Sequence, residues 1–298
     1  IDKPSDFFNS VIYTGNGGTQ SITGVGFKPD FTWCKKRDSA GNNGLFDIVR
    51  GVTKILYSND PSSQGTSANS LTAFNSDGFS AGGETETNAN NGTYVSWNWL
   101  AGGSQGSSNT AGSINTNYTS ANTTSGFSIS SFSGTGSNAT VGHGLGVKPD
   151  VIIIKSYENG QQWSSYWSPL GATKYMRFNT TSAVATSSAR FNNTEPTTSV
   201  FTVSTDGEVN TSGEDQIAYC FAQKKGFSKI GSYIGNGNAD GPFVFCGFKP
   251  AWILVKLSSG VDDWQILDNK RNPINIMDKY LRPNEYAAAT TNAVVDAV

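Results

Sequence analysis

Hydrophobic and polar positions along the chain form short runs that are rich in β-branched and aromatic residues and are separated by Gly, Asn, Asp and Pro. Such residues suit a pleated, half-buried surface. The runs are residues 10–13, 31–35, 94–99, 127–132, 151–156, 200–203, 217–221 and 252–257. They predict an all-β protein built from antiparallel β-sandwiches of the jelly-roll or lectin-like kind.

Signals for helices are weak. Residues 284–289 are the best helical candidate, and a turn is expected around residues 48–56. Residues 151–154 are continuously apolar, which indicates a central strand that is covered on both faces.

One motif is written three times along the chain, with a Gly-x-Gly turn followed by Gly-x-Lys-Pro. In each copy a second lysine follows seven residues after the first, across an apolar run. Repetition at this spacing predicts tandem copies of one structural unit. Glycine suits tight turns and proline begins the next strand, so we interpret the motif as a structural corner. The copies begin at Gly15, Gly134 and Gly235, with Lys-Pro at 28–29, 148–149 and 249–250.

Two further landmarks extend the repeat. Asp47-x-x-Arg50 in the first copy returns as Asp268-x-x-Arg271 in the third, and Trp167 occupies that place in the second. The simplest interpretation of the Asp-Arg pair is a salt bridge that ties a loop to the sandwich. The second landmark is Leu-x-x-Asn at 56–59 and 281–284, with methionine in place of leucine at 176–179.

These landmarks predict three β-sandwich units, at residues 1–103, 104–226 and 227–298. The third lacks its own closing strand, so we expect it to be incomplete and the chain to be a segment of a longer polypeptide. Residues 101–125 are rich in Gly, Ser, Thr and Asn and resemble a flexible linker, on which the first unit could hinge. Residues 113–119 alternate well enough to form an edge strand instead. The short connection at 223–227 predicts a defined orientation between the second and third units.

Composition narrows the classes of function. Only 15% of the 298 residues are charged and the net charge is −2, so the chain has no electrostatic footprint for nucleic acid or an acidic membrane surface. No apolar run approaches the roughly 20 residues of a spanning helix, so no membrane insertion is expected. Cys34, Cys220 and Cys246 lie in apolar or aromatic runs and are interpreted as buried free thiols.

Candidate catalytic residues are few. His143 is the only histidine, which excludes a histidine metal cluster, and its Gly-His-Gly setting favours a turn histidine bonded to the backbone over a catalytic one. Glu84 and Glu86 are close in sequence but lie among Gly, Thr and Asn, where a solvated loop explains them as well as catalysis does. We therefore expect neither an enzyme nor a cofactor.

A weak calcium candidate lies in the third unit. Asn236, Asn238 and Asp240, followed by Gly241, imitate the first half of a calcium loop. The acidic ligand expected six residues after the glycine is absent, since Gly247 stands there. Partial matches of this kind are frequent in Asn-rich turns.

Two aromatic groups could serve either packing or binding. Trp97 and Trp99 fall on the same face of their predicted strand, as expected for core residues. Trp163, Tyr166 and Trp167 fall in a predicted loop and are the candidate contacts to sugar rings, with packing as the alternative.

Seven short motifs lie at residues 13–17, 26–30, 46–51, 77–79, 142–146, 227–233 and 269–273. In combination they resemble a repeat domain of unassigned biochemistry that occurs in virion-associated proteins of marine bacteriophages. The likeness covers essentially the whole chain and implies a tail-fibre or appendage component, often joined to concanavalin-like sandwiches. It implies no catalytic or ligand residues.

The leading hypothesis is a structural or adhesive module of a phage virion fibre, located on the extracellular virion. Its expected partners are other virion subunits and possible host-surface glycans, and a homo-oligomer is expected, with a trimer as the first choice for a fibre. The alternative is a lectin-like carbohydrate-binding module that uses Trp163, Tyr166 and Trp167. A glycan-degrading enzyme is the least favoured hypothesis, because no recognisable motif places an acid pair.

Overall fold

The computed structural model describes residues 1–238 and 240–297. It consists almost entirely of antiparallel strands, which confirms the predicted all-β class. Each of the eight predicted runs contains a strand. The helices are single turns: a 3-10 turn at Pro4–Asp6, α1 (Thr85–Asn88), α2 (Ser188–Phe191) and α3 (Gly207–Asn210).

The predicted helix at 284–289 is wrong. These residues form an irregular loop whose backbone is bonded to the first part of the chain. The Ala289 N–H donates to the Arg37 carbonyl (2.9 Å), and the Tyr286 carbonyl accepts from the Gly41 N–H (2.8 Å). Tertiary partners thus take the backbone groups that a helix would have paired internally.

We call residues 1–103 the first segment; it forms a six-stranded and a three-stranded sheet. The large sheet has the order β1-β9-β3-β4-β5-β6, and the small one β2-β8-β7. The strands are β1 (Phe8–Thr14), β2 (Gln20–Ile22), β3 (Phe31–Lys36), β4 (Asn43–Asp47), β5 (Lys54–Tyr57), β6 (Gly65–Thr66), β7 (Leu71–Asn75), β8 (Gly78–Ala81) and β9 (Thr93–Trp99).

The second segment, residues 104–226, repeats the order of the large sheet with one added edge strand, but its small sheet has two strands and no counterpart of β7. Its large sheet runs β10-β11-β18-β13-β14-β15-β16, and its small sheet pairs β12 with β17. From β11 onward each strand has the counterpart expected from the motif spacing. The strands are β10 (Tyr118–Asn122), β11 (Phe127–Ser133), β12 (Ala139–Gly142), β13 (Val151–Ser156), β14 (Ser164–Trp167), β15 (Lys174–Arg177), β16 (Ala185–Thr186), β17 (Val200–Val203) and β18 (Asp215–Phe221).

The third segment, residues 227–298, has fewer strands in its described part. β19 (Trp252–Val255) pairs with β20 (Gln265–Asp268), and β21 (Met277–Tyr280) pairs with β22 (Thr290–Val295). An isolated bridge between Ile266 and Leu281 joins the two hairpins. These strands correspond to β3, β4, β5 and β6 of the first segment.

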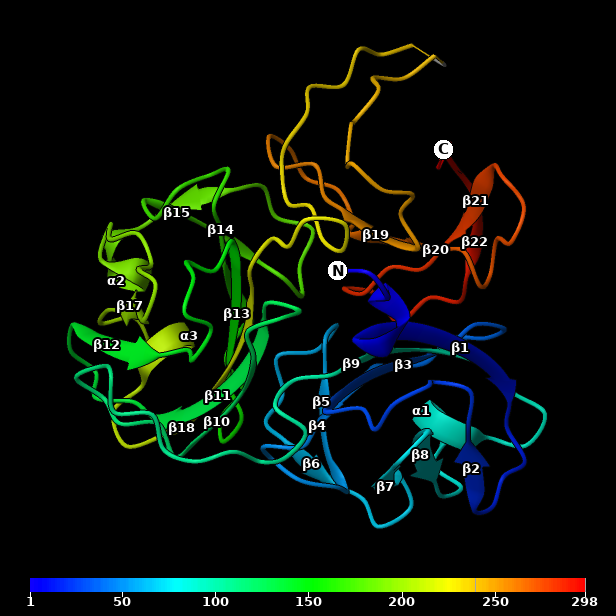
Figure 1. The fold of residues 1–298 in the computed structure, drawn as a ribbon, viewed down its shortest axis with the longest axis horizontal. Coiled ribbons are helices and arrows are strands. Elements are labelled where there is room, and N and C mark those ends of the chain that lie inside the picture. The colour runs from blue at the N-terminus through cyan, green and yellow to red at the C-terminus, as the bar shows by residue number, and fades with distance from the viewer. Residues whose placement is uncertain (239, 298) are drawn as a thin grey trace.

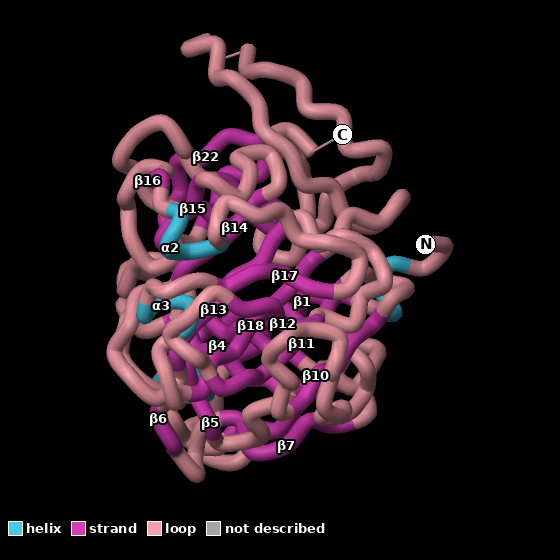
Figure 2. The backbone as a smooth tube through the Cα atoms, turned by 90° about the vertical axis from the view of Figure 1, so that its left-hand side faces the viewer, coloured by secondary structure: helices cyan, strands magenta, loops and turns pink. Residues whose placement is uncertain are grey.

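In Figure 1 the first segment lies at the lower right, the second at the left and the third above them. All three contribute residues to one apolar core. The inner faces of the sheets supply this core, with Phe31 and Trp97 from the first segment, Tyr219 from the second and Trp264 from the third. Separate clusters fill the outer faces, between each large sheet and its own small sheet. A side view shows the strands layered through the body, with loops at its upper end (Figure 2).

Three backbone hydrogen bonds at corresponding positions close the segments into a ring. Each donor follows the leucine or methionine of Leu-x-x-Asn by eight residues, and each acceptor follows the Lys-Pro lysine by nine. The Gln64 N–H donates to the Tyr157 carbonyl (2.8 Å), the Val184 N–H to the Ser258 carbonyl (2.9 Å) and the Ala289 N–H to the Arg37 carbonyl (2.9 Å). The first segment therefore bonds to the second, the second to the third and the third to the first.

The connection between the first and second segments is held in place. Asp30 accepts hydrogen bonds from the backbone of Ala101 (2.8 Å) and Gly103 (2.6 Å), and the connection ends in β10 of the second segment's sheet. A side-chain bond from Gln105 to the Val49 carbonyl (2.9 Å) adds a further contact. The flexible linker and hinge expected at residues 101–125 are therefore wrong, because hydrogen bonds to both segments fix this stretch.

Candidate functional site

Two of the three aromatic residues predicted to contact sugars lie in a strand, and the third directly precedes it. Trp163 precedes β14, and Tyr166 and Trp167 belong to it. The Trp163 and Tyr166 side chains are fully buried, with the Trp163 indole donating to the Tyr57 carbonyl (2.9 Å) of the first segment. No ring face of these two residues is exposed, so their predicted contact with glycans is wrong.

Trp167 is half-buried and packs on the third segment. Its ring lies 5.4 Å from that of Trp264, measured between centroids, and its indole N–H donates to the Ser165 hydroxyl (2.9 Å) in the same strand. This ring also belongs to the packing between segments, so the sugar-binding prediction has no exposed aromatic platform at this place.

Both predicted Asp-Arg pairs form, and both are buried. The Arg50 Nε–Asp47 Oδ2 and Arg271 Nε–Asp268 Oδ2 distances are each 2.6 Å. Each aspartate also accepts the backbone N–H of its arginine, at 2.8 Å and 2.9 Å. The arginines reach back to the carbonyls of Leu45 and Ile266, so the two sites share one geometry.

Each buried aspartate also accepts a hydrogen bond from a neighbouring segment. The Tyr219 hydroxyl of β18 donates to Asp47 (2.7 Å), and the Trp97 indole of β9 donates to Asp268 (3.0 Å). Tyr219 and Trp97 hold the same place in β18 and β9, opposite Ile153 and Trp33 respectively. A buried carboxylate needs several donors to offset its lost hydration, so these contacts lock the segments together.

The second segment replaces this polar arrangement with an apolar one. Trp167 stands where the aspartate would be, and Leu170 stands where the arginine would be. Both side chains pack against the shared core as partly buried residues. Their neighbour in the ring would be a strand of the third segment that corresponds to β9 and β18.

The lysines that follow the motif lie beneath loops. Lys35 Nζ donates to the Gly41 carbonyl (2.5 Å), and Lys155 Nζ donates to the carbonyls of Ser156 (2.5 Å) and Asn159 (3.0 Å). Burial lowers the pKa of Lys35 and Lys155 to about 8. Lys256, their counterpart in the third segment, is half-exposed, and burial lowers its pKa as well.

The weak calcium candidate is a series of turns. Asn236 Oδ1 accepts the Asn238 N–H (3.0 Å), and Asn238 Oδ1 accepts the Asp240 N–H (3.1 Å). These carboxamide oxygens are therefore engaged by the local backbone, as in Asx turns. Within residues 1–238 and 240–297, no group of three or more His, Cys, Asp or Glu side chains is placed to hold a metal ion.

The remaining titratable candidates have local structural contacts. His143 accepts the Leu145 N–H at Nδ1 and lies 3.2 Å from the Thr197 carbonyl through Nε2, which confirms the predicted turn histidine. Glu84 accepts from the Ser67 hydroxyl (2.5 Å), and burial raises the pKa of Glu86. Cys34 and Cys220 are buried free thiols as expected, whereas Cys246 is only half-buried.

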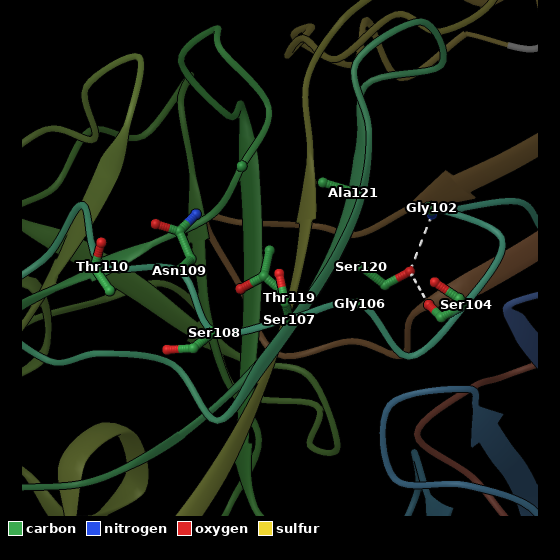
Figure 3. Close-up of a pocket in the computed structure, with 11 residues that line it drawn as sticks. Gly102, Ser104, Gly106, Ser107, Ser108, Asn109, Thr110, Thr119, Ser120 and Ala121 are labelled. Carbon is green, nitrogen blue, oxygen red and sulfur yellow. Dashed lines mark hydrogen bonds between the residues drawn. The ribbon is translucent and has the colours of Figure 1, made fainter.

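A polar groove of about 470 Å³ lies beside β10 in the second segment (Figure 3). The Ser120 hydroxyl stiffens its wall by accepting the Gly102 N–H (3.0 Å) and donating to the Ser104 carbonyl (2.6 Å). The other polar side chains that line it are Ser107, Ser108, Asn109, Thr110 and Thr119. It is open and shallow, and its walls offer hydroxyls in place of aromatic rings.

A much larger cleft, of about 2050 Å³, separates β19 from the rest of the ring. All four residues of β19 line it. The other walls come from residues 226–233, 238 and 240–251 ahead of β19 and from the first and second segments. The apolar residues of those two segments include Phe8, Trp99, Phe127, Val151, Ile153, Trp167 and Phe221.

β19 borders this cleft with an open edge. β3 lies between β4 and β9, and β13 lies between β14 and β18, whereas β19 has β20 as its partner within the described residues. Trp252, Leu254 and Lys256 are half-buried, although the corresponding residues of β3 and β13 are buried. An unpaired edge with a half-covered apolar face is a site for another strand.

Sequence reasoning missed a set of donors between the segments. Asn43, Trp163 and Trp264 each follow the Lys-Pro lysine by fifteen residues. Asn43 donates to the Glu285 carbonyl (2.9 Å) of the third segment, and Trp163 and Trp264 likewise donate to carbonyls of the segment that precedes their own in the ring. Their shared spacing was visible in the sequence, but an asparagine in place of tryptophan concealed their common role.

Among the helices of the described residues, none has the length and apolar character needed to cross a membrane. No curated protein matches the chain, and no solved structure matches it either. A family model, in contrast, matches residues 3–298, nearly the whole length. The chain therefore belongs to the family described as a domain of unknown function (DUF7483).

Proposed function

We propose that this chain is a structural module of a phage virion fibre or appendage, and that it joins the assembly through the third segment. The observation that carries the proposal is the exposure of large apolar side chains there: Ile234 is 90% exposed, Phe243 76% and Phe245 75%. Together with the open edge of β19, they form a surface of the kind that proteins use to bind one another.

The interlocked ring supports a structural role. Buried Asp-Arg pairs and hydrogen bonds between segments hold the first two segments and the β19–β20 hairpin in one body. Such a body can carry load and present one surface in a fixed direction. The virion setting, the extracellular location and a homo-oligomer rest on the motif resemblance, and all three remain part of the proposal.

Labelling of particles tests this function. Antibodies that bind the β12–β17 sheet of the second segment, whose residues do not line the cleft, should mark an appendage on purified phage particles viewed by electron microscopy. Serum that has been absorbed with the purified chain is the control. Particles that stay unlabelled while the same serum detects the chain in the lysate would contradict the proposal.

A second candidate function is contact with host glycans at the polar groove beside β10. The hydroxyl and carboxamide lining of the groove favours it, because sugars are bound through such groups. Ser108→Phe would fill the groove and should abolish any glycan binding detected on an array. Ser63→Phe, an equal change at an exposed serine of the first segment, should leave binding unchanged. An array without hits would remove this candidate.

A further inference from the structure

We infer that the open edge of β19 receives an added β-strand from outside residues 1–298. This strand runs antiparallel to β19 and places an apolar side chain opposite Lys256 and aromatic side chains opposite Leu254 and Trp252. The inference rests on the proposed assembly role and names the partner of that surface.

The chain contains two filled copies of this interface. β9 adds antiparallel to β3, and β18 adds antiparallel to β13, in the same register relative to the motif. Both strands carry an apolar residue and then two aromatic residues at alternate positions on the face toward the shared core. These residues are Val95, Trp97 and Trp99 in β9, and Ile217, Tyr219 and Phe221 in β18.

The positions that receive these side chains have direct counterparts in β19. Trp99 lies opposite Phe31, and Phe221 lies opposite Val151; both partners follow the Lys-Pro lysine by three residues. The same spacing leads to Trp252 in the third segment. The indole N–H of Trp252 is buried without a hydrogen-bond partner, and its ring lies against the cleft.

The far wall of the cleft specifies the central residue of the incoming strand. Tyr219 and Trp97 each donate to an aspartate of a neighbouring segment, but Trp167 and Leu170 stand at the corresponding place in the second segment. An incoming residue there meets apolar atoms and needs no donor group. We therefore expect phenylalanine or another purely apolar side chain to be accepted opposite Leu254.

At the end of the incoming strand, the described part of the third segment lacks a contact that holds the chain after β9 and after β18. Asp30 and Asp150 accept backbone N–H groups of the chain that leaves β9 and β18, whereas Ala251 occupies this position in the third segment. Ala251 has no side-chain acceptor for such a chain. The edge is thus built to hold the strand itself and not to hold a connection that continues into a further segment.

A second copy of this chain is a poor source of the strand. Its β9 and β18 are already paired on both sides, and Trp97 and Tyr219 are buried in its own shared core. Releasing either strand would open a complete sheet and expose its aromatic residues to water, at a large cost in free energy. The occupant is therefore an additional segment with the β9 pattern.

Hydrogen exchange of the whole 298-residue chain tests this inference. Two synthetic peptides, covering residues 92–101 and 214–222, serve as probes, and a third is the 92–101 peptide with V95S, W97S and W99S. We expect both native-sequence peptides to slow exchange of the β19 amides at least about tenfold, because these amides gain hydrogen-bond partners. The substituted peptide should have no effect.

Variants of the chain locate the binding. Leu254→Arg places a charge on the receiving face and should abolish the slowing, while protected β20 amides verify that the hairpin remains folded. Ile274→Arg, at an exposed residue that lies outside β19 and does not line the cleft, should leave the slowing of exchange intact.

Three results would overturn the inference: no slowing by either native-sequence peptide, equal slowing by the substituted peptide, or β19 amides that become protected on self-association of the chain alone. Each can occur whether or not antibodies label an appendage, so failure of strand capture and failure of the virion role are separable.

Discussion

The second and third segments begin with the same motif and the same two strands. Within the described residues, the first of these strands is buried and paired on both edges only in the second segment. β13 is buried along its length between β14 and β18, whereas all four residues of β19 are half-buried. Strand-forming side chains before β19, including Tyr233, Val244 and Phe245, form no strand in the described part of the chain. A strand needs a partner that satisfies its backbone, so sequence preference alone did not suffice here.

The first and third segments invite a different comparison, because they contain the same buried ion pair. Asp47 is approached by a tyrosine and Asp268 by a tryptophan, each from a strand that fills the position beside a central strand. The second segment, which faces the open edge of β19, is the one without the pair. The polar contact is therefore present at the two junctions where a neighbouring strand supplies a donor.

The largest effect should come from breaking a buried ion pair. Asp47→Ala leaves the Arg50 charge and the Tyr219 hydroxyl buried without their acceptor, and should lower the free energy of unfolding by about 3–5 kcal/mol. Asp6→Ala is the matched control, since Asp6 pairs with Lys3 at the same spacing but on the surface. It should cost at most about 1 kcal/mol. Denaturant unfolding measures both, and equal losses would contradict the structural distinction.

A smaller loss should follow removal of one donor between segments. Trp97→Phe keeps an aromatic ring but removes the N–H that reaches Asp268, and Tyr219→Phe does the same at Asp47. Each should cost about 1.5–3 kcal/mol, the usual range for a hydrogen bond to a charged group. Trp97→Phe should also speed proteolysis of the third segment.

Trp167→Phe is the control for these variants, because its indole bonds within its own strand. It should be milder than Trp97→Phe, even though both replace the same residue type. A larger loss at Trp167 would show that the contact between segments is not what stabilises this junction.

The smallest effect concerns pH and the buried lysines. Burial lowers the pKa of Lys155 to about 8 in the folded chain, below the ordinary 10.5 of the unfolded one. Burial of the charged Lys155 side chain therefore lowers the free energy of unfolding by its full amount below pH 8. This loss disappears as pH rises from about 8 toward 10.5. Relative to Lys155→Met, the wild-type chain should gain roughly 1–2 kcal/mol between pH 8 and pH 9.5.

Lys256 allows a comparison between a buried and a half-exposed lysine at the same place in the motif. Its pKa is also lowered by burial, but the side chain is half-exposed at the open edge. Lys256→Met should thus change the pH profile less than Lys155→Met does. Chemical unfolding across this pH range measures both, and equal profiles would indicate that the two lysines have the same surroundings.

The residue pattern predicted structure well where that structure depends on residues close together in the sequence. Alternating β-branched residues placed the strands, and the three-residue spacing of Asp47 and Arg50 was sufficient for an ion pair. The aromatic triplet at 163–167 was misplaced, because a Trp-rich stretch beside polar residues does not reveal whether another segment covers it. The cover comes from Tyr57 and Trp264, which are distant in sequence.

The sequence by itself determined the all-β class and the threefold spacing of the motif, since these depend on side-chain pattern and chain order. The tertiary structure alone decided that the three segments close into a ring. It also decided which polar groups meet and which edge stays open. The physical reason is that burial and hydrogen-bond partners are properties of residues brought together from distant parts of the chain, and spacing within one copy does not contain them.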